Sequence, residues 1–214
     1  MSAAVTTHPA TAPTTVPPAD TLGQAPRVLG LGGTLRAWSS SEKALRYALD
    51  AAAERGASTR LITAAELDLP MYDPDRVAAG HAEDLLAAVR EADALVIATP
   101  GYHGNLSGLL KNALDYLQEL ADDPSPYLHD KAVGCIVTAA GWQAGAATLA
   151  ALRATVHALR GWPTPLGVVI NSAEPVFGPG GAVTDPKIAA QLGILGDQVV
   201  TFARRHRIGV DGRA

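Results

Sequence analysis

The stretch Gly33-Thr34-Leu35-Arg36-Ala37-Trp38-Ser39-Ser40-Ser41 decides the fold of this 214-residue chain. It follows the short apolar run 27–32 and precedes the segment 41–55, whose apolar residues recur at helical spacing. A loop of this kind between a strand and a helix attracts phosphate, because the first amides of a helix have no partner within the helix. The stretch therefore predicts a strand–loop–helix unit with a phosphate site.

Strands and helices alternate along the chain after residue 26. We expect strands at residues 27–32, 58–63, 93–99, 131–138 and 166–171. We expect helices at residues 41–55, 81–91, 106–120, 146–160 and 186–205. Five strands, each followed by a helix, indicate the α/β class and a doubly wound, five-stranded parallel sheet. For a chain of this length we favour the flavodoxin-like strand order 2-1-3-4-5 over a six-stranded dinucleotide-binding fold.

The first 26 residues differ in composition from the rest of the chain. They are mostly Thr, Pro and Ala, and no Lys or Arg precedes Arg27. We therefore expect a disordered leader at 1–26 and one flavodoxin-like domain at 27–214. The leader lacks the features of a signal or transit peptide, and no apolar run approaches the roughly 18 residues of a membrane span. These observations predict a cytoplasmic protein.

The charge balance argues against nucleic acid as a partner. Charged residues make up 18% of the chain and the net charge is −4, without blocks of one sign. Binding to nucleic-acid phosphates needs a basic stripe, which the sequence lacks. The lone Cys135 lies in an apolar run, so we expect a buried thiol and a reducing compartment.

Two further segments follow expected strands and carry glycine, hydroxyl or amide groups. They are Pro100-Gly101-Tyr102-His103-Gly104-Asn105 and Ala139-Ala140-Gly141-Trp142-Gln143-Ala144-Gly145. In the order 2-1-3-4-5, the loops after strands one, three and four lie side by side at the edge where open parallel sheets bind ligands. Three such loops indicate one flat, phosphorylated ligand, and we predict flavin mononucleotide (FMN).

The first loop offers the donors that a terminal phosphate needs. Thr34, Ser39 and Ser41 supply hydroxyl groups, and Arg36 supplies a planar guanidinium. A dinucleotide fingerprint would need glycine where Leu35 stands and an acidic residue at the end of the second strand, and the GK[ST] sequence of a P-loop is missing. The alternative is an ordinary helix cap made by Ser39 or Ser41.

The second and third loops are expected to contact the ring of the ligand. Tyr102 would place its ring at the pocket edge, and the backbone amides around it would meet a heteroaromatic rim; the residues concerned are Pro100, Gly101, Tyr102, His103, Gly104 and Asn105. His103 is either a structural hydrogen-bonding residue or an acid–base group, and the lack of a second ligand at suitable spacing argues against a metal site. Amides of Gly141, Trp142 and Gln143 would form a nest for an anionic acceptor, such as the pyrimidine edge of a reduced flavin. Trp142 stacks on the ring, covers a neighbouring subunit, or packs on the core.

These motifs resemble those of the NAD(P)H-dependent FMN reductases. The first loop resembles their GSxRxxSxN phosphate loop, and residues 100–116 are similar to their PEYNGSxxGxLKNAxDW signature. The third loop resembles their glycine-rich turn after the fourth strand. Departures from the family pattern are Thr34 for Ser, Ser41 for Asn, Gly101 for Glu, His103 for Asn, and the pair Trp142-Gln143 in the glycine-rich turn.

The resemblance implies hydride transfer from NADPH or NADH to FMN, with no side chain acting as a catalytic acid or base. It implies that Thr34, Arg36, Ser39 and Ser41 hold the phosphate. It also implies a homodimer, often paired into a homotetramer, with each flavin near a subunit interface. Reduced flavin would then pass to a monooxygenase partner or to a second small electron acceptor.

Three alternatives remain at this point. The first is a quinone, azo or metal-oxyanion reductase that retains its flavin. The second is a flavodoxin-type electron carrier, which has no hydride substrate of its own. The third is a phospho-receiver domain, which would need carboxylates where this chain has Gly32-Gly33 and Thr99-Pro100.

Overall fold

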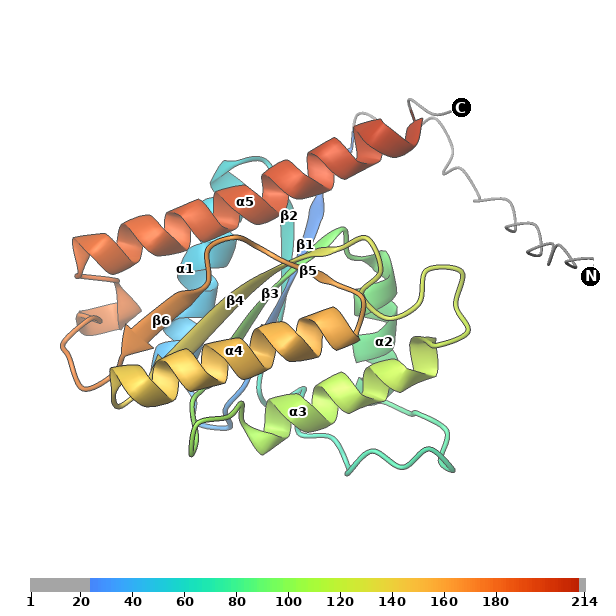
Figure 1. Cartoon of the computed structure of the whole chain (residues 1–214), viewed down its shortest axis with the longest axis horizontal. Coiled ribbons are helices and arrows are strands. Elements are labelled where there is room, and N and C mark those ends of the chain that lie inside the picture. The colour runs from blue at the N-terminus through green and yellow to red at the C-terminus, as the bar shows by residue number, and fades with distance from the viewer. Residues whose placement is uncertain (1–23, 212–214) are drawn as a thin grey trace, which may run out of the picture.

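A computed structural model of the chain describes residues 24–211, with side chains up to Arg207 (Figure 1). Most of the leader expected at residues 1–26 lies outside the described residues. The described elements run in chain order as follows: β1 Arg27–Gly32, α1 Ser40–Glu54, β2 Ser58–Ile62, α2 His81–Glu91, β3 Ala94–Pro100, α3 Gly108–Asp115, the 3₁₀ turn η2 Tyr116–Leu120, β4 Ala132–Ala139, α4 Trp142–Ala158, β5 Trp162–Pro163, β6 Val168–Asn171, the 3₁₀ turn η3 Pro179–Gly181 and α5 Pro186–Asp211.

The strands form one parallel sheet in the order β2-β1-β3-β4-β5, and β6 also pairs with β4. The predicted α/β class and strand order are confirmed. The fifth strand, however, consists of two pieces: β5 pairs with the start of β4, and β6 pairs with its end. Pro163 and Pro165 lie in or beside the break, where proline has no N–H for a sheet ladder.

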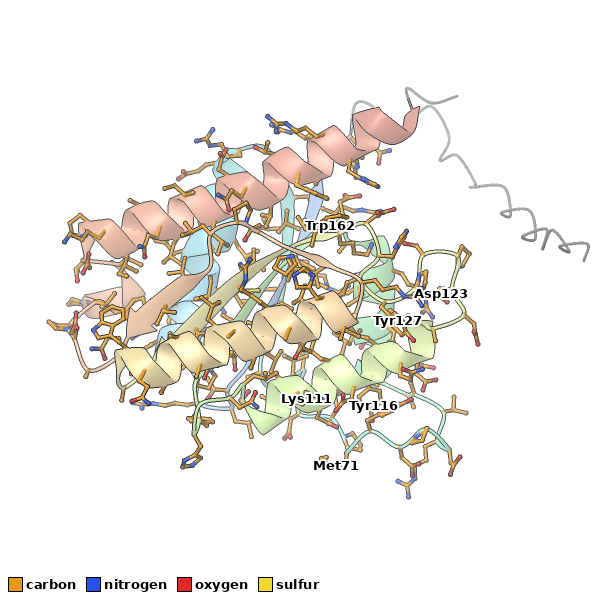
Figure 2. All side chains as sticks on the ribbon, viewed as in Figure 1. Met71, Lys111, Tyr116, Asp123, Tyr127 and Trp162 are labelled. Carbon is orange, nitrogen blue, oxygen red and sulfur yellow. The ribbon has the colours of Figure 1, made fainter. Side chains whose placement is uncertain are left out.

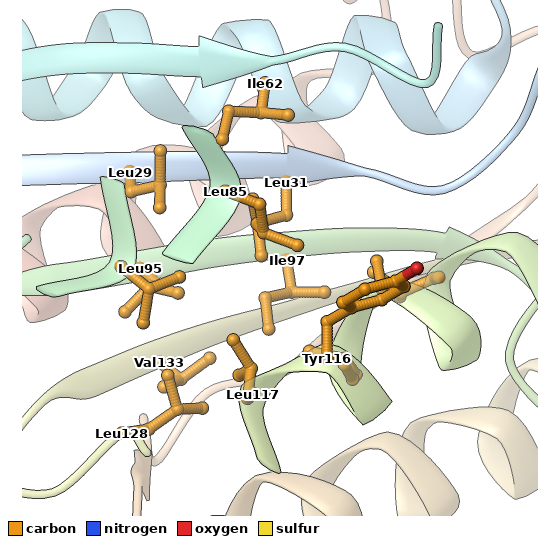
Figure 3. Close-up of a cluster of buried hydrophobic side chains, with 14 of the residues drawn as sticks. Leu29, Leu31, Ile62, Leu85, Leu95, Ile97, Tyr116, Leu117, Leu128 and Val133 are labelled. Carbon is orange, nitrogen blue, oxygen red and sulfur yellow. The ribbon is translucent and has the colours of Figure 1, made fainter. Parts of the chain in front are cut away.

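Helices cover both faces of the sheet. Helices α1 and α5 contact each other on one face, while α2, α3 and α4 pack on the other. Each face has its own hydrophobic core. Figure 3 shows the core between the sheet and helices α2, α3 and α4, in which Leu31, Ile97 and Leu117 lie close together. Strands β3 and β4 are buried along their whole length, as expected of central strands covered on both faces.

The loop between β2 and α2 is fixed by Asn112, a residue of the second motif. The Asn112 side chain donates to the carbonyls of Leu69 (3.2 Å) and Pro70 (2.8 Å) and accepts from the amide of Tyr72 (2.8 Å). Tyr116 donates its hydroxyl to Pro70 as well (3.2 Å). Figure 2 shows Met71 beside α3, which carries this clamp.

Tyr72 adds a second contact to the same clamp. Its hydroxyl donates to Glu119 at 2.9 Å. Burial, together with this hydrogen bond, raises the pKa of Tyr72 to about 12. The phenol therefore stays protonated, and the contact to Glu119 persists until the pH approaches that value.

We expect Asn112→Ala to lower the free energy of unfolding by about 1–2 kcal/mol, because two carbonyls and one amide lose a partly buried partner. Chemical denaturation of the variant measures the change. The same substitution at the exposed Gln118 of η2 should leave stability within about 0.5 kcal/mol. Equal midpoints for the two variants would show that the clamp contributes nothing.

No helix in the part of the chain that the structure describes is both long enough and apolar enough to cross a membrane.

Candidate functional site

The three loops lie together at the carboxyl edge of the sheet, as the strand order requires. The end of β1 runs beside β3, and Pro100 at the end of β3 lies opposite Thr138 of β4. The Gly101 amide donates to the Thr138 carbonyl at 2.8 Å, which joins the second loop to the strand that leads into the third. The chain therefore brings its three glycine-containing loops to one place.

Ser107 connects the first loop to the second, and we did not single it out as a site residue from the sequence. Its hydroxyl donates to the Gly33 carbonyl at 2.6 Å and accepts from the amide of Leu110 at 3.2 Å, so it also caps α3. Its own amide donates to Thr99 Oγ1 at 3.0 Å. The apolar pattern predicts that this helix begins at Leu106, with Ser107 inside it, but α3 begins at Gly108 and Ser107 is its N-cap. The contact to Gly33 had no signal in the sequence.

Gly33 allows this connection because it has no side chain. A Cβ at this position would lie 3.0 Å from the Ala98 carbonyl oxygen and 3.1 Å from Ser107 Oγ. Neither neighbour is free to move, since one is backbone in a buried strand and the other is a helix cap. Glycine therefore brings the backbone of the first loop against the second.

Two hydroxyl groups of the first loop accept hydrogen bonds from the loop itself. Thr34 Oγ1 accepts from the Arg36 amide at 3.3 Å, and Ser39 Oγ accepts from the Glu42 amide at 3.2 Å. Ser39 is thus the N-cap of α1, as the alternative interpretation expected. A hydroxyl that accepts in this way still has its proton to donate to an anion.

Arg36 and the loop amides supply the remaining donors. The Arg36 side chain is exposed at the loop. Within residues 24–211, the amides of Ala37 and Ser40 have no hydrogen-bond acceptor. Free amides next to hydroxyls and a guanidinium match the chemistry of a phosphate monoester, so the donor set fits this part of FMN.

Ser41 lies beneath the loop rather than on its surface. It is 1% exposed, and its hydroxyl accepts from Thr138 Oγ1 at 3.4 Å. This contact ties the first turn of α1 to β4. The other three predicted phosphate residues, by contrast, are at least partly open to solvent.

The second loop is a tight turn. Tyr102 and Asn105 exchange backbone hydrogen bonds of 2.9 and 3.0 Å, and the two residues between them have positive φ, 52° at His103 and 82° at Gly104. Such a pair of left-handed residues is typical of a two-residue type I′ turn. The Tyr102 ring is more than half exposed, and the His103 side chain makes no hydrogen bond to any described residue.

Gly101, where the resembling family has Glu, packs against α4. A Cβ at position 101 would lie 2.8 Å from Thr148 Oγ1 and 3.1 Å from Ala139 Cβ. Thr148 is fully buried, and its hydroxyl has no partner among the described residues. A larger residue at 101 would therefore displace the start of the second loop.

The third loop is shorter than expected, because α4 begins at Trp142 instead of Ala146. Gly141 caps the helix with φ 147°, a conformation that favours glycine. Gln143 and Ala144 are good helix formers, which explains why the helix begins directly after Gly141. The amides of Trp142 and Gln143 thus belong to the first turn of a helix and point away from its body.

Trp142 does not pack on the core, so that alternative is wrong. Its side chain is 55% exposed and borders a groove of about 460 Å³ that also involves β6 and the start of α5. The groove wall contains Asn171, Glu174 and Lys187. The indole is therefore available to a ligand or to another subunit.

The thiol of Cys135 is buried inside β4 and is not exposed at the loops. Burial raises the pKa of the Cys135 thiol, inside β4, to about 12, so the thiol is not ionised at neutral pH. In the part of the chain that the structure describes, no three His, Cys, Asp or Glu side chains gather as metal ligands would. The chemistry that the loops offer is binding through amides, hydroxyls and one guanidinium.

Comparison with known proteins gives consistent results. Residues 26–175 match the sequence profile of the NADPH-dependent FMN reductases. The chain is 32% identical over 165 residues to an NAD(P)H-dependent FMN reductase of Pseudomonas aeruginosa, covering 75% of this chain and 86% of that protein. It is 31% identical over 122 residues to an FMN-dependent NADPH-azoreductase of Staphylococcus aureus, covering 56% of this chain and 61% of that protein.

Among solved structures, the chain resembles a flavoenzyme NAD(P)H:(acceptor) oxidoreductase from Paracoccus denitrificans, with a TM-score of 0.70 and 24% identity. The likeness covers 85% of this chain and 99% of that one. At this level of identity, the comparison supports the fold.

Proposed function

Because the chain belongs to the NADPH-dependent FMN reductase family, we propose that it reduces FMN with NAD(P)H and releases the reduced flavin to a monooxygenase partner. The protein is an NAD(P)H-dependent flavin oxidoreductase, and FMN and NAD(P)H are its cofactors. The observation that carries the proposal is the donor set of the first loop, where free amides, two hydroxyls and Arg36 belong to one short segment before α1.

In this proposal, Thr34, Arg36 and Ser39 hold the flavin phosphate. Ser41 contributes from beneath, by fixing the first turn of α1 to β4. The guanidinium and the two hydroxyl protons donate to phosphate oxygens, and the amides of Ala37 and Ser40 complete the set of donors.

The second and third loops hold the ring. The second loop, Pro100, Gly101, Tyr102, His103, Gly104 and Asn105, presents backbone amides and the Tyr102 ring to the edge of the flavin. Amides of Gly141, Trp142 and Gln143 at the start of α4 stabilise negative charge on the carbonyl side of the ring. Bound FMN supplies the redox chemistry by accepting hydride from the nicotinamide. The protein groups only bind, orient and exclude water.

A second candidate is a flavin-retaining reductase of azo compounds, quinones or metal oxyanions. It is favoured by the similarity to an FMN-dependent NADPH-azoreductase. The two functions differ in whether FMN stays with the protein between turnovers. The Trp142 groove at the β6 edge would admit a bulky acceptor next to the third loop.

We further propose that the protein is cytoplasmic and forms a homodimer or homotetramer. The exposed aromatic side chains around the loops, Trp38, Tyr102 and Trp142, support the idea that a second subunit or the flavin covers them. No contact with another copy is needed for the first-loop donor set.

One experiment tests the proposal. The purified full chain is titrated with FMN while flavin fluorescence is followed, and NADPH is then added under nitrogen while flavin absorbance is followed. We expect quenched fluorescence and bleaching by NADPH without any other protein. Absence of both would overturn the proposal, and binding without bleaching would leave a flavodoxin-type carrier.

Gel filtration of the FMN-loaded protein separates the first two candidates. Loss of the yellow colour during the run supports a flavin-releasing reductase. A colour that co-elutes with the protein supports the flavin-retaining alternative. The elution volume reports the oligomeric state.

A further inference from the structure

The first loop already has an anion bound to its backbone, the carboxylate of Glu42. Glu42 lies in the first turn of α1, and its Oε2 accepts the backbone N–H of Trp38 at 3.0 Å. Its Oε1 accepts from Arg46 Nε and Nη2 at 3.0 and 2.8 Å. One amide of the proposed phosphate loop is therefore occupied by a side chain of the protein.

This contact holds the loop in an unusual conformation. Trp38 has φ 55°, which is uncommon for a bulky residue and persists only where neighbouring contacts impose it. The imposing contacts are the bond to Glu42 and the Arg46 guanidinium, which lies 5.5 Å from the centre of the Trp38 ring. Glu42, Arg46 and Trp38 thus form a closed local cluster.

The basic side chains next to the first loop are also already engaged by groups of the protein. Arg46 is paired with Glu42, and the Lys43 ammonium lies over the Phe177 ring at 5.6 Å. Among the basic side chains of residues 33–46, this leaves Arg36 as the one without an ion pair or ring contact among described residues. An incoming phosphate dianion therefore finds one uncommitted guanidinium, that of Arg36, while Arg46 stays paired with Glu42 in α1.

We propose that Glu42 competes with the flavin phosphate for the first loop and so weakens the hold of the protein on FMN. The inference rests on the proposed function, and it favours a protein that releases its flavin over one that retains it. Glu42 weakens FMN binding mainly by holding two donors, the Trp38 amide and the Arg46 guanidinium, away from the phosphate. Repulsion between the two anions adds to this effect, although Arg46 and solvent both reduce it. A reductase with this residue binds FMN less tightly than its donor set allows, and it releases the reduced flavin readily.

The test compares Glu42→Gln with wild type in the full chain. Glutamine keeps the shape and the carbonyl oxygen that can accept from Trp38, but it carries no charge. We expect FMN to bind about tenfold more tightly to Glu42→Gln, with slower dissociation, and riboflavin, which has no phosphate, to bind unchanged. Glu54→Gln, at the far end of α1, is the matched control and should bind FMN as wild type does.

A probe other than flavin makes the result independent of redox activity. Inorganic phosphate should raise the melting temperature of Glu42→Gln more than that of wild type or Glu54→Gln. Melting without ligand checks that all three proteins are folded.

Each remaining outcome overturns the inference. Equal FMN affinities of Glu42→Gln and wild type would show that the carboxylate does not compete. Weaker binding would mean that Glu42 only positions the loop, and an equal gain for riboflavin would show that the effect does not act through phosphate. If wild type binds neither FMN nor phosphate, the proposed function fails together with the inference.

Discussion

Replacing Ser107 with alanine should lower the free energy of unfolding by about 2–4 kcal/mol. The variant loses the N-cap of α3, which costs about 1 kcal/mol. It also leaves the buried Gly33 carbonyl without the donor that now lies 2.6 Å away, which costs a further 1–3 kcal/mol or so. Chemical denaturation measures the total loss in the free energy of unfolding.

Ser39→Ala is the matched control, because Ser39 caps α1 in the same way at a more open position. It should cost only about 0.5–1 kcal/mol. If the two variants are equally destabilised, the contact between Ser107 and Gly33 adds nothing beyond capping. In addition, FMN affinity should fall in Ser107→Ala, because this residue holds the first loop against the second.

Arg36→Ala should weaken FMN binding by about 1.5–3 kcal/mol, the range for a hydrogen bond to a charged group. The reason is that Arg36 is the one arginine of the first loop, and the guanidinium of Arg46 in α1 is already held by Glu42 and Trp38. Stability should change little, since the Arg36 side chain is exposed. Fluorescence titration with FMN gives the change in dissociation constant.

Two controls make the Arg36 result specific. Arg60→Ala removes the same charge from exposed β2, far from the loops, and should leave FMN affinity unchanged. Riboflavin should bind Arg36→Ala and wild type equally. An unchanged FMN dissociation constant in Arg36→Ala would remove this residue from the site.

Local patterns in the sequence were enough for most of the fold. The ends of β1 and α2 lie where the apolar periodicity predicted them, and α1 begins and ends within one residue of expectation. Apolar spacing reports which side of an element is buried, and this is a property of a few consecutive residues. The predicted start of α4 was wrong because the residue types of Gly141, Trp142 and Gln143 are compatible both with a loop and with the first turn of a helix.

The split of the fifth strand was not visible locally. Residues 162–163 follow a helix stop and form a strand only because the start of β4 lies beside them. A two-residue strand has no periodicity of its own, so its existence depends on a partner elsewhere in the chain. The same holds for Asn112, whose partners are some forty positions away.

For the site, the sequence alone determined the three loops, their donor groups and, through the strand order, their meeting at one edge of the sheet. Tertiary structure decided how those groups are used. It placed Ser41 beneath the loop, joined Gly33 to Ser107 across 74 positions, and set Thr148 against Gly101. The physical reason is that hydrogen bonds and close contacts between distant segments depend on where packing brings the backbones, whereas the residue types and their helical or strand spacing are local.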